Sequence, residues 1–283
     1  MLKVFGFVRR NANLTHDDYR AAHVGYHNSF GRRLTGIRGY ILNVWANRTV
    51  DESVGPPLAA RLTRSEPAGF NDMWDGWGLL MFDNLSEYLA ARSPARDHAG
   101  PNGLGFDPRV GEVGGDDDYL YNGTPIQFHI DESVALPVRR PERKLFKLVQ
   151  FAKRPAGLSF EEFRAYWTGR YAAHVNRIPG LRGHVINFRT GLDVMTAFFP
   201  QNAEAFTPEG EVRRNAFFDT WDGMAELWFD SPAQFVAGRA DPVLGPKLDA
   251  LEREQFGAVF YREVDETVAV LPNRGPAPDF YYR

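Results

Sequence analysis

The sequence contains no cysteine in its 283 residues. That absence excludes disulfides, thiolate nucleophiles, iron–sulfur clusters and cysteine-based zinc sites, and it fits a reducing compartment. The chain also lacks a basic N-terminal region followed by a long apolar run, and no stretch approaches the ~18 apolar residues that a membrane-spanning helix needs. We therefore expect a cytoplasmic protein without a membrane partner.

Excess charge is also missing. The 33 basic and 36 acidic residues give a net charge of −3, so the sequence has no electrostatic signature of a nucleic-acid-binding protein. Glycine-rich nucleotide-binding motifs and the GxSxG elbow of serine hydrolases are absent as well. These absences leave a small molecule as the expected partner. Aromatic residues, in contrast, are abundant, with 22 Phe, 11 Tyr and 6 Trp. They indicate either an aromatic core or an aromatic-lined cavity.

An internal repeat organises the chain. The segment LTHDDYRAAHVGYHNSFGRRLTGIRGYILN at 14–43 aligns without a gap with LSFEEFRAYWTGRYAAHVNRIPGLRGHVIN at 158–187. A second pair, FNDMWDGWGLLMFD at 70–83 and FFDTWDGMAELWFD at 217–230, follows in the same order. Two such blocks predict a duplicated unit, with one repeat at 1–138 and the other at 139–283. The proline-containing stretch at 135–142 is the expected linker.

Both halves show the same order of secondary-structure signals. Strands are expected at 3–9 and 144–153, and the capping-box patterns Thr15-x-x-Asp18 and Ser159-x-x-Glu162 begin a helix in each half. Gly36 and Gly180 are expected to end these helices. A strand, a strand, a short helix and a strand follow, at 39–45, 76–83, 85–92 and 127–136 and again at 183–188, 224–230, 232–238 and 258–271. The order β-α-β-β-α-β is the ferredoxin-like, or split βαβ, arrangement.

A ferredoxin-like sheet covers one face with its two helices and leaves the other face in need of a partner. Two copies on one chain can cover each other. We therefore predict an α+β protein in which two ferredoxin-like repeats are fused into a pseudo-twofold barrel, with a cavity between the sheets.

The repeated blocks resemble the EthD domain of the dimeric α+β barrel superfamily. That domain combines a helix of the pattern "eeFr-x-yw-x-x-x-Ha", a strand "pGlrgYv-x-N" and a strand "DG-x-aElwF", and WDGMAELWFD at 221–230 matches the last element closely. The resemblance covers most of both halves and implies a dimeric-type α+β barrel. The superfamily contains lyases, dehydratases, decarboxylases, cofactor-free monooxygenases and haem enzymes, so the fold does not select a reaction.

The two repeats differ where a site is expected. His27, at the helix histidine of the family pattern, is replaced by Tyr171 in the second half, and His23 by Trp167. Histidine titrates near neutrality and can act as general base and general acid. A histidine that only hydrogen-bonds a backbone carbonyl is an equally good interpretation. His23 and His27 also have the spacing of two metal ligands on one helix turn, but no third ligand is evident, and we predict no metal.

The strands add further candidates. Leu80, Phe82 and their second-half equivalents are the same in both halves and are expected to face the helices. The alternate positions differ, with Leu79 and Met81 in the first half and Glu226 and Trp228 in the second, and they are expected to face the cavity. Glu226 is then either a proton-transfer group or one member of a salt bridge. On the second strands, Asn43 and Asn187 are expected on the face opposite Tyr40 and His184.

Long insertions at 46–69, 93–118 and 190–215 distinguish the chain from a minimal domain, and loops of this length are typical of lids. They are equally consistent with solvated surface loops. The C-terminal stretch after residue 271 is a further candidate lid.

The leading hypothesis is a cofactor-independent lyase that acts on a phenolic or polyketide-like aromatic by dehydration, decarboxylation or retro-aldol cleavage, as in aromatic compound degradation. The catalytic candidates are His27, Tyr171 and Glu226. The expected substrate-binding residues are His23, Tyr40, Met81, Asn43, His184, Asn187 and Trp228.

Two alternatives remain open. One is a haem- or oxygen-dependent oxidoreductase, with His174 or His184 as axial ligand in the haem case. The other is a binding protein for an apolar ligand. No cofactor is predicted, and dimerisation through outer surfaces is left open.

Overall fold

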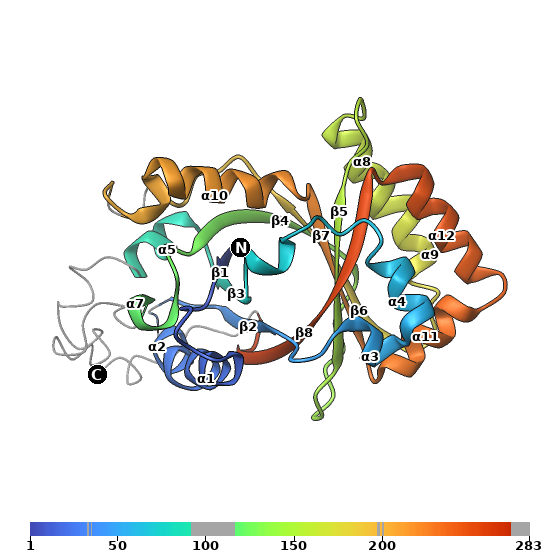
Figure 1. Cartoon of the computed structure of the whole chain (residues 1–283), viewed down its shortest axis with the longest axis horizontal. Coiled ribbons are helices and arrows are strands. Elements are labelled where there is room, and N and C mark those ends of the chain that lie inside the picture. The colour runs from blue at the N-terminus through green and yellow to red at the C-terminus, as the bar shows by residue number, and fades with distance from the viewer. Residues whose placement is uncertain (33, 35, 92–116, 197–198, 200, 273–283) are drawn as a thin grey trace.

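The computed structural model describes residues 1–32, 34, 36–91, 117–196, 199 and 201–272. Eight antiparallel strands close into one barrel in the order β1-β3-β2-β8-β5-β7-β6-β4, and helices cover its outside (Figure 1). The strands are β1 (Leu2–Val8), β2 (Gly39–Trp45), β3 (Gly76–Phe82), β4 (Ile126–Leu136), β5 (Phe146–Lys153), β6 (Leu181–Arg189), β7 (Gly223–Phe229) and β8 (Ala258–Val270). The predicted α+β fold, a pseudo-twofold barrel of the dimeric type, is confirmed.

The two longest strands join the halves. β8 pairs with β5 of its own half and also with β2 of the other half, where Asn43 faces Glu266. β4 does the same with β1 and β6, where Asn187 faces Glu132. Each fourth strand therefore runs from one sheet into the next, which closes the barrel and removes exposed sheet edges. The division of the chain near residue 138 stays a prediction.

The first helix of each half has a π-helical centre. In the first half α1 (His16–Ala21) runs into the π-helix η1 (Ala22–His27) and α2 (Asn28–Gly31). In the second half α8 (Phe160–Tyr166) runs into η3 (Trp167–Tyr171) and α9 (Ala172–Val175). The side chains of Thr15 and Ser159 accept the expected capping hydrogen bonds, and Gly36 and Gly180 have φ values of 79° and 78°. The predicted helix starts are confirmed, whereas the helices end at Gly31 and Val175, so Gly36 and Gly180 belong to the turns that lead into the next strands and do not end the helices.

The insertions contain helices that the sequence did not reveal. Residues 46–69 form α3 (Val50–Val54) and α4 (Pro56–Leu62), and residues after 190 form η4 (Glu204–Phe206) and α10 (Pro208–Asp219). Figure 1 shows α3 and α4 beside α11 (Pro232–Ala240) and α12 (Leu244–Gln255), so the first insertion packs on the second half. The remaining elements are η2 (Phe70–Asp72), α5 (Leu85–Ala91) and α7 (Asp117–Leu120). Most of the expected lid at 93–118, and most of the C-terminal one, lie outside the described residues.

Strand alternation sorts the side chains as expected. Leu80 and Phe82 pack in the core beneath the first-half helices, and Leu227 and Phe229 do so in the second half. The inward-facing residues of the first half, among them Leu79 and Met81, join a buried cluster of aromatic rings. Four buried rings from the segments that precede β3 and β7 belong to the same cluster: Phe70, Trp74, Phe217 and Trp221. This part of the interior is a packed core, which corrects the expectation of an aromatic-lined cavity between the sheets.

Over the described part of the chain, no helix is both long and apolar enough to cross a membrane.

Candidate functional site

A small cavity lies between the first helix of the first half and the outer face of its sheet. Its volume is about 50 Å³, enough for a few water molecules, which need about 10–15 Å³ each. Side chains that carry polar atoms gather around it from the helix, the strands and the segment before β4. The polar lining residues are His23, His27, Tyr40, Tyr121 and Gln127, and Gly6 forms part of the floor.

His23 is the buried centre of this site. Its Nδ1 lies 2.8 Å from the hydroxyl of Tyr121, while its Nε2 is shielded from solvent and has no hydrogen-bond partner among the described residues. The imidazole is stacked between the rings of Tyr19, at 5.2 Å, and His27, at 5.3 Å. Burial, assisted by His27, places the pKa of His23 well below its ordinary value. His23 is therefore neutral near pH 7, with one ring nitrogen that donates and one that accepts.

The second half shows why the first half has this cavity. The repeat places Gln150 at the position of Gly6 and larger aromatic side chains at the two histidine positions, Trp167 and Tyr171. The amide Nε2 of Gln150 donates to the hydroxyls of Tyr171 and Tyr261, each at 2.7 Å. The space beneath the second-half helix is thus filled by side chains that the first half does not have.

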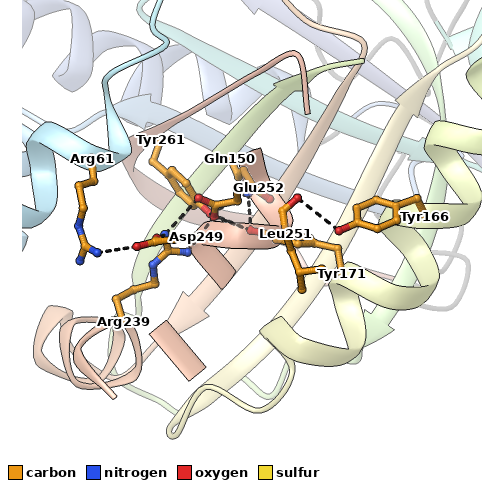
Figure 2. A network of polar contacts seen from close by, with 9 residues as sticks. All are labelled: Arg61, Gln150, Tyr166, Tyr171, Arg239, Asp249, Leu251, Glu252 and Tyr261. Atoms are coloured by element: carbon orange, nitrogen blue, oxygen red, sulfur yellow. Dashed lines mark hydrogen bonds and ion pairs between the residues drawn. The ribbon is translucent and has the colours of Figure 1, made fainter. Parts of the chain in front are cut away.

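A buried ion cluster completes this filled counterpart (Figure 2). Glu252 accepts hydrogen bonds from Tyr171 and Tyr261, both at 2.8 Å, and forms an ion pair with Arg239, also at 2.8 Å. Arg239 also contacts Asp249, which in turn binds Arg61 from α4. The pKa of Glu252 is lowered because Arg239 and the two phenols outweigh the effect of burial. Burial and the nearby Glu252 raise the pKa of Tyr171 well above its usual value.

A second polar network lies inside the barrel. The amine of Lys147, which has no exposed surface, lies 2.5 Å from Glu226, 2.8 Å from Glu266 and 2.6 Å from the side-chain oxygen of Asn43. Asn187 donates to Glu226 at 3.0 Å, and the indole of Trp228 donates to Glu266 at 2.9 Å. Lys147 and Arg140 together lower the pKa of Glu266 to about 2. Glu226 is therefore one member of a salt bridge, as one of its two interpretations anticipated.

The structure does not bring the three predicted catalytic residues together. His27 lines the first-half cavity, Tyr171 belongs to the ion cluster on the outside of the second half, and Glu226 lies inside the barrel. The expectation that they share one cavity is corrected, because the two repeats place equivalent helices on opposite outer faces of the barrel. Their individual roles stay predictions.

The predicted substrate-binding residues divide in the same way. His23 and Tyr40 line the first-half cavity. Met81 packs in the aromatic core, and Asn43, Asn187 and Trp228 belong to the network around Lys147. His184 lies on the helix-facing side of the second half, with its Nδ1 2.9 Å from Asn176.

The two histidines considered as haem ligands have other surroundings. Burial lowers the pKa of His184 to about 3. His174 is partly exposed, with its Nδ1 2.9 Å from a backbone carbonyl of its own helix. Neither lines the cavity at His23. Within the described ranges, no group of three or more His, Asp or Glu residues is arranged to hold a metal ion.

Gly6, Tyr121 and Gln127 contribute to the cavity but escaped the sequence analysis. Gly6 could have been found, because the repeat pairs it with Gln150, a large polar residue in an otherwise apolar strand. Tyr121 had no such signal, since it lies near the end of an insertion where the repeats do not align.

Lys147, in the network inside the barrel, was visible as a lone cation within the apolar stretch LFKLVQF, but its partners come from strands distant in sequence.

Comparisons with known proteins agree with this architecture. Residues 155–250 match the model of the EthD domain, and no curated protein matches the sequence. Among solved structures, the chain is similar to a provisionally named monooxygenase from Fusobacterium nucleatum, with a TM-score of 0.52 and 7% identity over 98% of this chain and 95% of that one. It is also similar to an anthrone oxidase-like protein, with a TM-score of 0.50 and 9% identity over 97% and 96% of the two chains.

These findings define the class of protein. At such low identities the likeness to the solved structures concerns the fold, which is a barrel built from two similar halves of one chain. The second half carries an EthD domain, and the first half repeats its sequence blocks. Residues 155–250 therefore match the EthD domain that the sequence resembled, and the whole chain has the fold of a dimeric-type α+β barrel.

Proposed function

We propose that the chain is a cofactor-independent acid–base enzyme that acts on a phenolic aromatic compound at the cavity of His23 and His27. The observation that carries this proposal is the pair of stacked imidazoles at a cavity that the second half fills. A neutral imidazole beside a buried cavity can accept a proton near pH 7, which suits general-base catalysis.

Each lining residue has a role in this proposal. His27, which is half-buried, takes the proton from the substrate. The Nε2 of His23, with its Nδ1 engaged by Tyr121, hydrogen-bonds the substrate oxygen. The cavity of about 50 Å³ is smaller than an aromatic ring requires, so the side chains of His27 and Tyr121 must rotate when a ring binds.

Two fates of the resulting anion define two reaction classes. In a lyase, the electron pair of the phenolate or carbanion expels a leaving group in conjugation with it, and an acid returns the proton to that group. The imidazolium formed in the first step supplies such an acid. Dehydration, decarboxylation and retro-aldol cleavage share this first step.

The names of the two structural neighbours favour an oxygen-dependent reaction as the second candidate. There the carbanion of an acidic ring CH₂ group reacts with O₂. The CH₂ group is oxidised to a ketone, one oxygen atom enters the ketone, and the other leaves as water. The substrate anion is the reductant, so the protein residues again need only move protons.

The proton-abstraction step can be tested before the reaction class is known. Anthrone, with its acidic CH₂ group, is incubated with the protein in D₂O without oxygen, and the loss of the CH₂ proton signal is followed by NMR. We expect exchange above the buffer rate, reduced at least about tenfold by His27→Gln, the effect typical of a lost general base. His174, which is partly exposed and does not line the cavity, provides the matched control His174→Gln.

Admission of oxygen then separates the reaction classes. Quinone formation at the exchange rate supports the oxygenase, whereas exchange without oxidation supports a lyase. Exchange at the buffer rate, or exchange insensitive to His27→Gln, would contradict both and leave the binding-protein alternative. A cytoplasmic location and a small aromatic partner remain part of this proposal.

A further inference from the structure

The end of β6 borders a second hollow that the proposed reaction does not use. This groove has a volume of about 480 Å³, within the range of ~300–1,000 Å³ that is usual for small-molecule sites. It lies between the last residues of β6 and the first turns of α8. Its walls include the partly exposed Phe160 as well as Arg164 and Arg189, with the fully buried Phe188 behind them. Apolar and cationic surfaces therefore face the same space.

Two of the three arginines in this groove are already paired. Arg164 lies 2.6 Å from Asp131, and Arg154 lies 3.6 Å from Asp222, which also accepts the backbone N–H of Arg154. Arg189 forms no ion pair with any residue that the structure describes. Its guanidinium packs instead over the ring of Phe218, 3.8 Å from the ring centre.

The environment of Arg189 disfavours an uncompensated charge. Burial lowers the pKa of this guanidinium, and the charges of Asp222 and Asp219 oppose the shift without reversing it. Its Nη1 is shielded from solvent without a hydrogen-bond partner in the described part of the chain. A half-buried cation in this position gains from an anion that enters the groove.

The two halves share the ion pairs that border the groove, but only the second half has Arg189. In the first half Arg10 pairs with Asp75 at 3.0 Å and Arg20 pairs with Asp265, which are the same two ion pairs at equivalent positions. Arg189, however, corresponds to Trp45, whose ring packs against Trp74 with centroids 6.0 Å apart. The ion pairs therefore belong to the shared fold, and the cation at position 189 belongs to the second half alone.

We propose that this groove binds an organic carboxylate with an apolar skeleton. The planar guanidinium of Arg189 matches a carboxylate in geometry and is weakly hydrated, so it can bind this anion with little desolvation cost. The partly exposed Phe160 lies beside the carbon atoms of the ligand. Asp131 and Asp222, which also line the groove, do not repel the anion strongly because Arg164 and Arg154 neutralise them.

Titration with benzoate tests this assignment. Binding to the full chain is measured by calorimetry, with benzamide as the uncharged isostere and inorganic phosphate as an anion without a ring. We expect benzoate to bind, and Arg189→Met to weaken it at least about tenfold, as removal of a charge-assisted hydrogen bond does. Arg253→Met, at an exposed arginine of α12, removes the same charge elsewhere and should leave the affinity unchanged.

Several results would overturn the proposal. Equal affinity in Arg189→Met and the wild type would show that the guanidinium is not the anion partner. Equal binding of benzamide would show that the carboxylate is not recognised, and equal binding of phosphate would show that the apolar contact with Phe160 contributes nothing. Arg189→Lys keeps the charge and the fold and loses the planar fork, so a weakened but measurable affinity is expected if Arg189→Met proves unstable.

Discussion

The imidazole of His23 lies parallel to that of His27, with ring centres 5.3 Å apart and planes 15° from parallel. In the second half the equivalent pair is Trp167 and Tyr171, which are both fully buried. The same helical frame therefore carries two titratable rings at a cavity in one half and two packing rings in the other. This difference explains why the repeat keeps its glycines and strands while the two histidine positions change.

Filling the cavity should abolish ligand binding without unfolding the protein. A Cβ atom at Gly6 would meet only the side chain of Gln127, at 3.5 Å, so Gly6→Gln can place an amide where Gln150 places one in the second half. We expect proton exchange with anthrone to fall at least about tenfold, the factor that ~1.4 kcal/mol of lost binding gives. The melting temperature should change little.

The matched control for this variant is Gly25→Ala, where an added Cβ has no neighbour within 4 Å. It should leave exchange unchanged and slightly raise stability, since alanine is the better helix former. Retention of full exchange in Gly6→Gln would mean that the ligand binds elsewhere.

Buried neutral histidines should make the fold less stable in mild acid. Burial lowers the pKa of His184 from 6.5 to about 3, and that of His23 also lies well below 6.5. Below pH 6.5 the unfolded chain binds protons that the folded chain does not bind, so the free energy of unfolding falls as the pH falls. From pH 6.5 to 5 this effect of His184 amounts to about 2 kcal/mol.

Urea unfolding at pH 7 and pH 5 measures this effect. His184→Gln should remove its share of the loss, whereas His174→Gln, on the surface, should not. Buried Glu266 does not contribute between pH 7 and pH 5. Its pKa is lowered to about 2 in the folded protein, so the stability that it provides is lost only below pH 4.5, the ordinary pKa of a glutamate. An identical pH dependence in wild type and His184→Gln would count against the neutral state of His184.

Much of the fold could be predicted from the sequence because the two repeats carry the same pattern of core positions. The pairs Leu80/Leu227 and Phe82/Phe229 are identical, and they fill equivalent positions under the helices. Alternation then places Glu226 and Trp228 on the inner face without further information. Local signals such as the Ser159 cap and the Gly180 turn act within a few residues, so they also appear directly in the sequence.

The helix register was harder to predict. The ordinary helical period of 3.6 residues places Tyr19, Ala22 and Tyr26 on one apolar face, yet Tyr26 is 52% exposed and His23 is buried. The π-helical turns rotate the helix so that every fourth residue points inward, and Tyr19, His23 and His27 therefore stack in one row. Tyr121, whose hydroxyl contacts His23, is distant from this helix in sequence. No periodic pattern in the sequence predicts this contact.

Removal of Lys147 should be among the most destabilising single changes in the chain. Its amine is fully buried between Glu226 and Glu266, so Lys147→Met removes the cation that these two carboxylates share and leaves Glu266 with Arg140 alone. We expect a loss of about 3–5 kcal/mol in the free energy of unfolding. The exposed Lys247 provides the control Lys247→Met, which should change stability by less than about 0.5 kcal/mol.

The triple variant Lys147→Met, Glu226→Gln, Glu266→Gln removes the lysine together with the two carboxylates that it neutralises. It should recover part of the lost stability, because replacement of a whole buried ion cluster costs less than removal of one partner. A triple variant no more stable than Lys147→Met would show that packing, not charge, dominates this region.

Tyr171 should contribute to stability and not to proton transfer, in contrast to its sequence-based assignment. Its hydroxyl lies between Gln150 and Glu252, and Glu252 keeps Arg239 and Tyr261 as partners when that hydroxyl is lost. Tyr171→Phe is therefore expected to lower the free energy of unfolding by about 1–2 kcal/mol. Because this cluster and the His23–His27 cavity lie on separate outer faces of the barrel, anthrone exchange should stay within about twofold of wild type, whereas His27→Gln lowers it at least about tenfold. Parallel urea titrations and exchange measurements on both variants decide the matter, and a tenfold loss of exchange in a folded Tyr171→Phe protein would restore Tyr171 to the reaction.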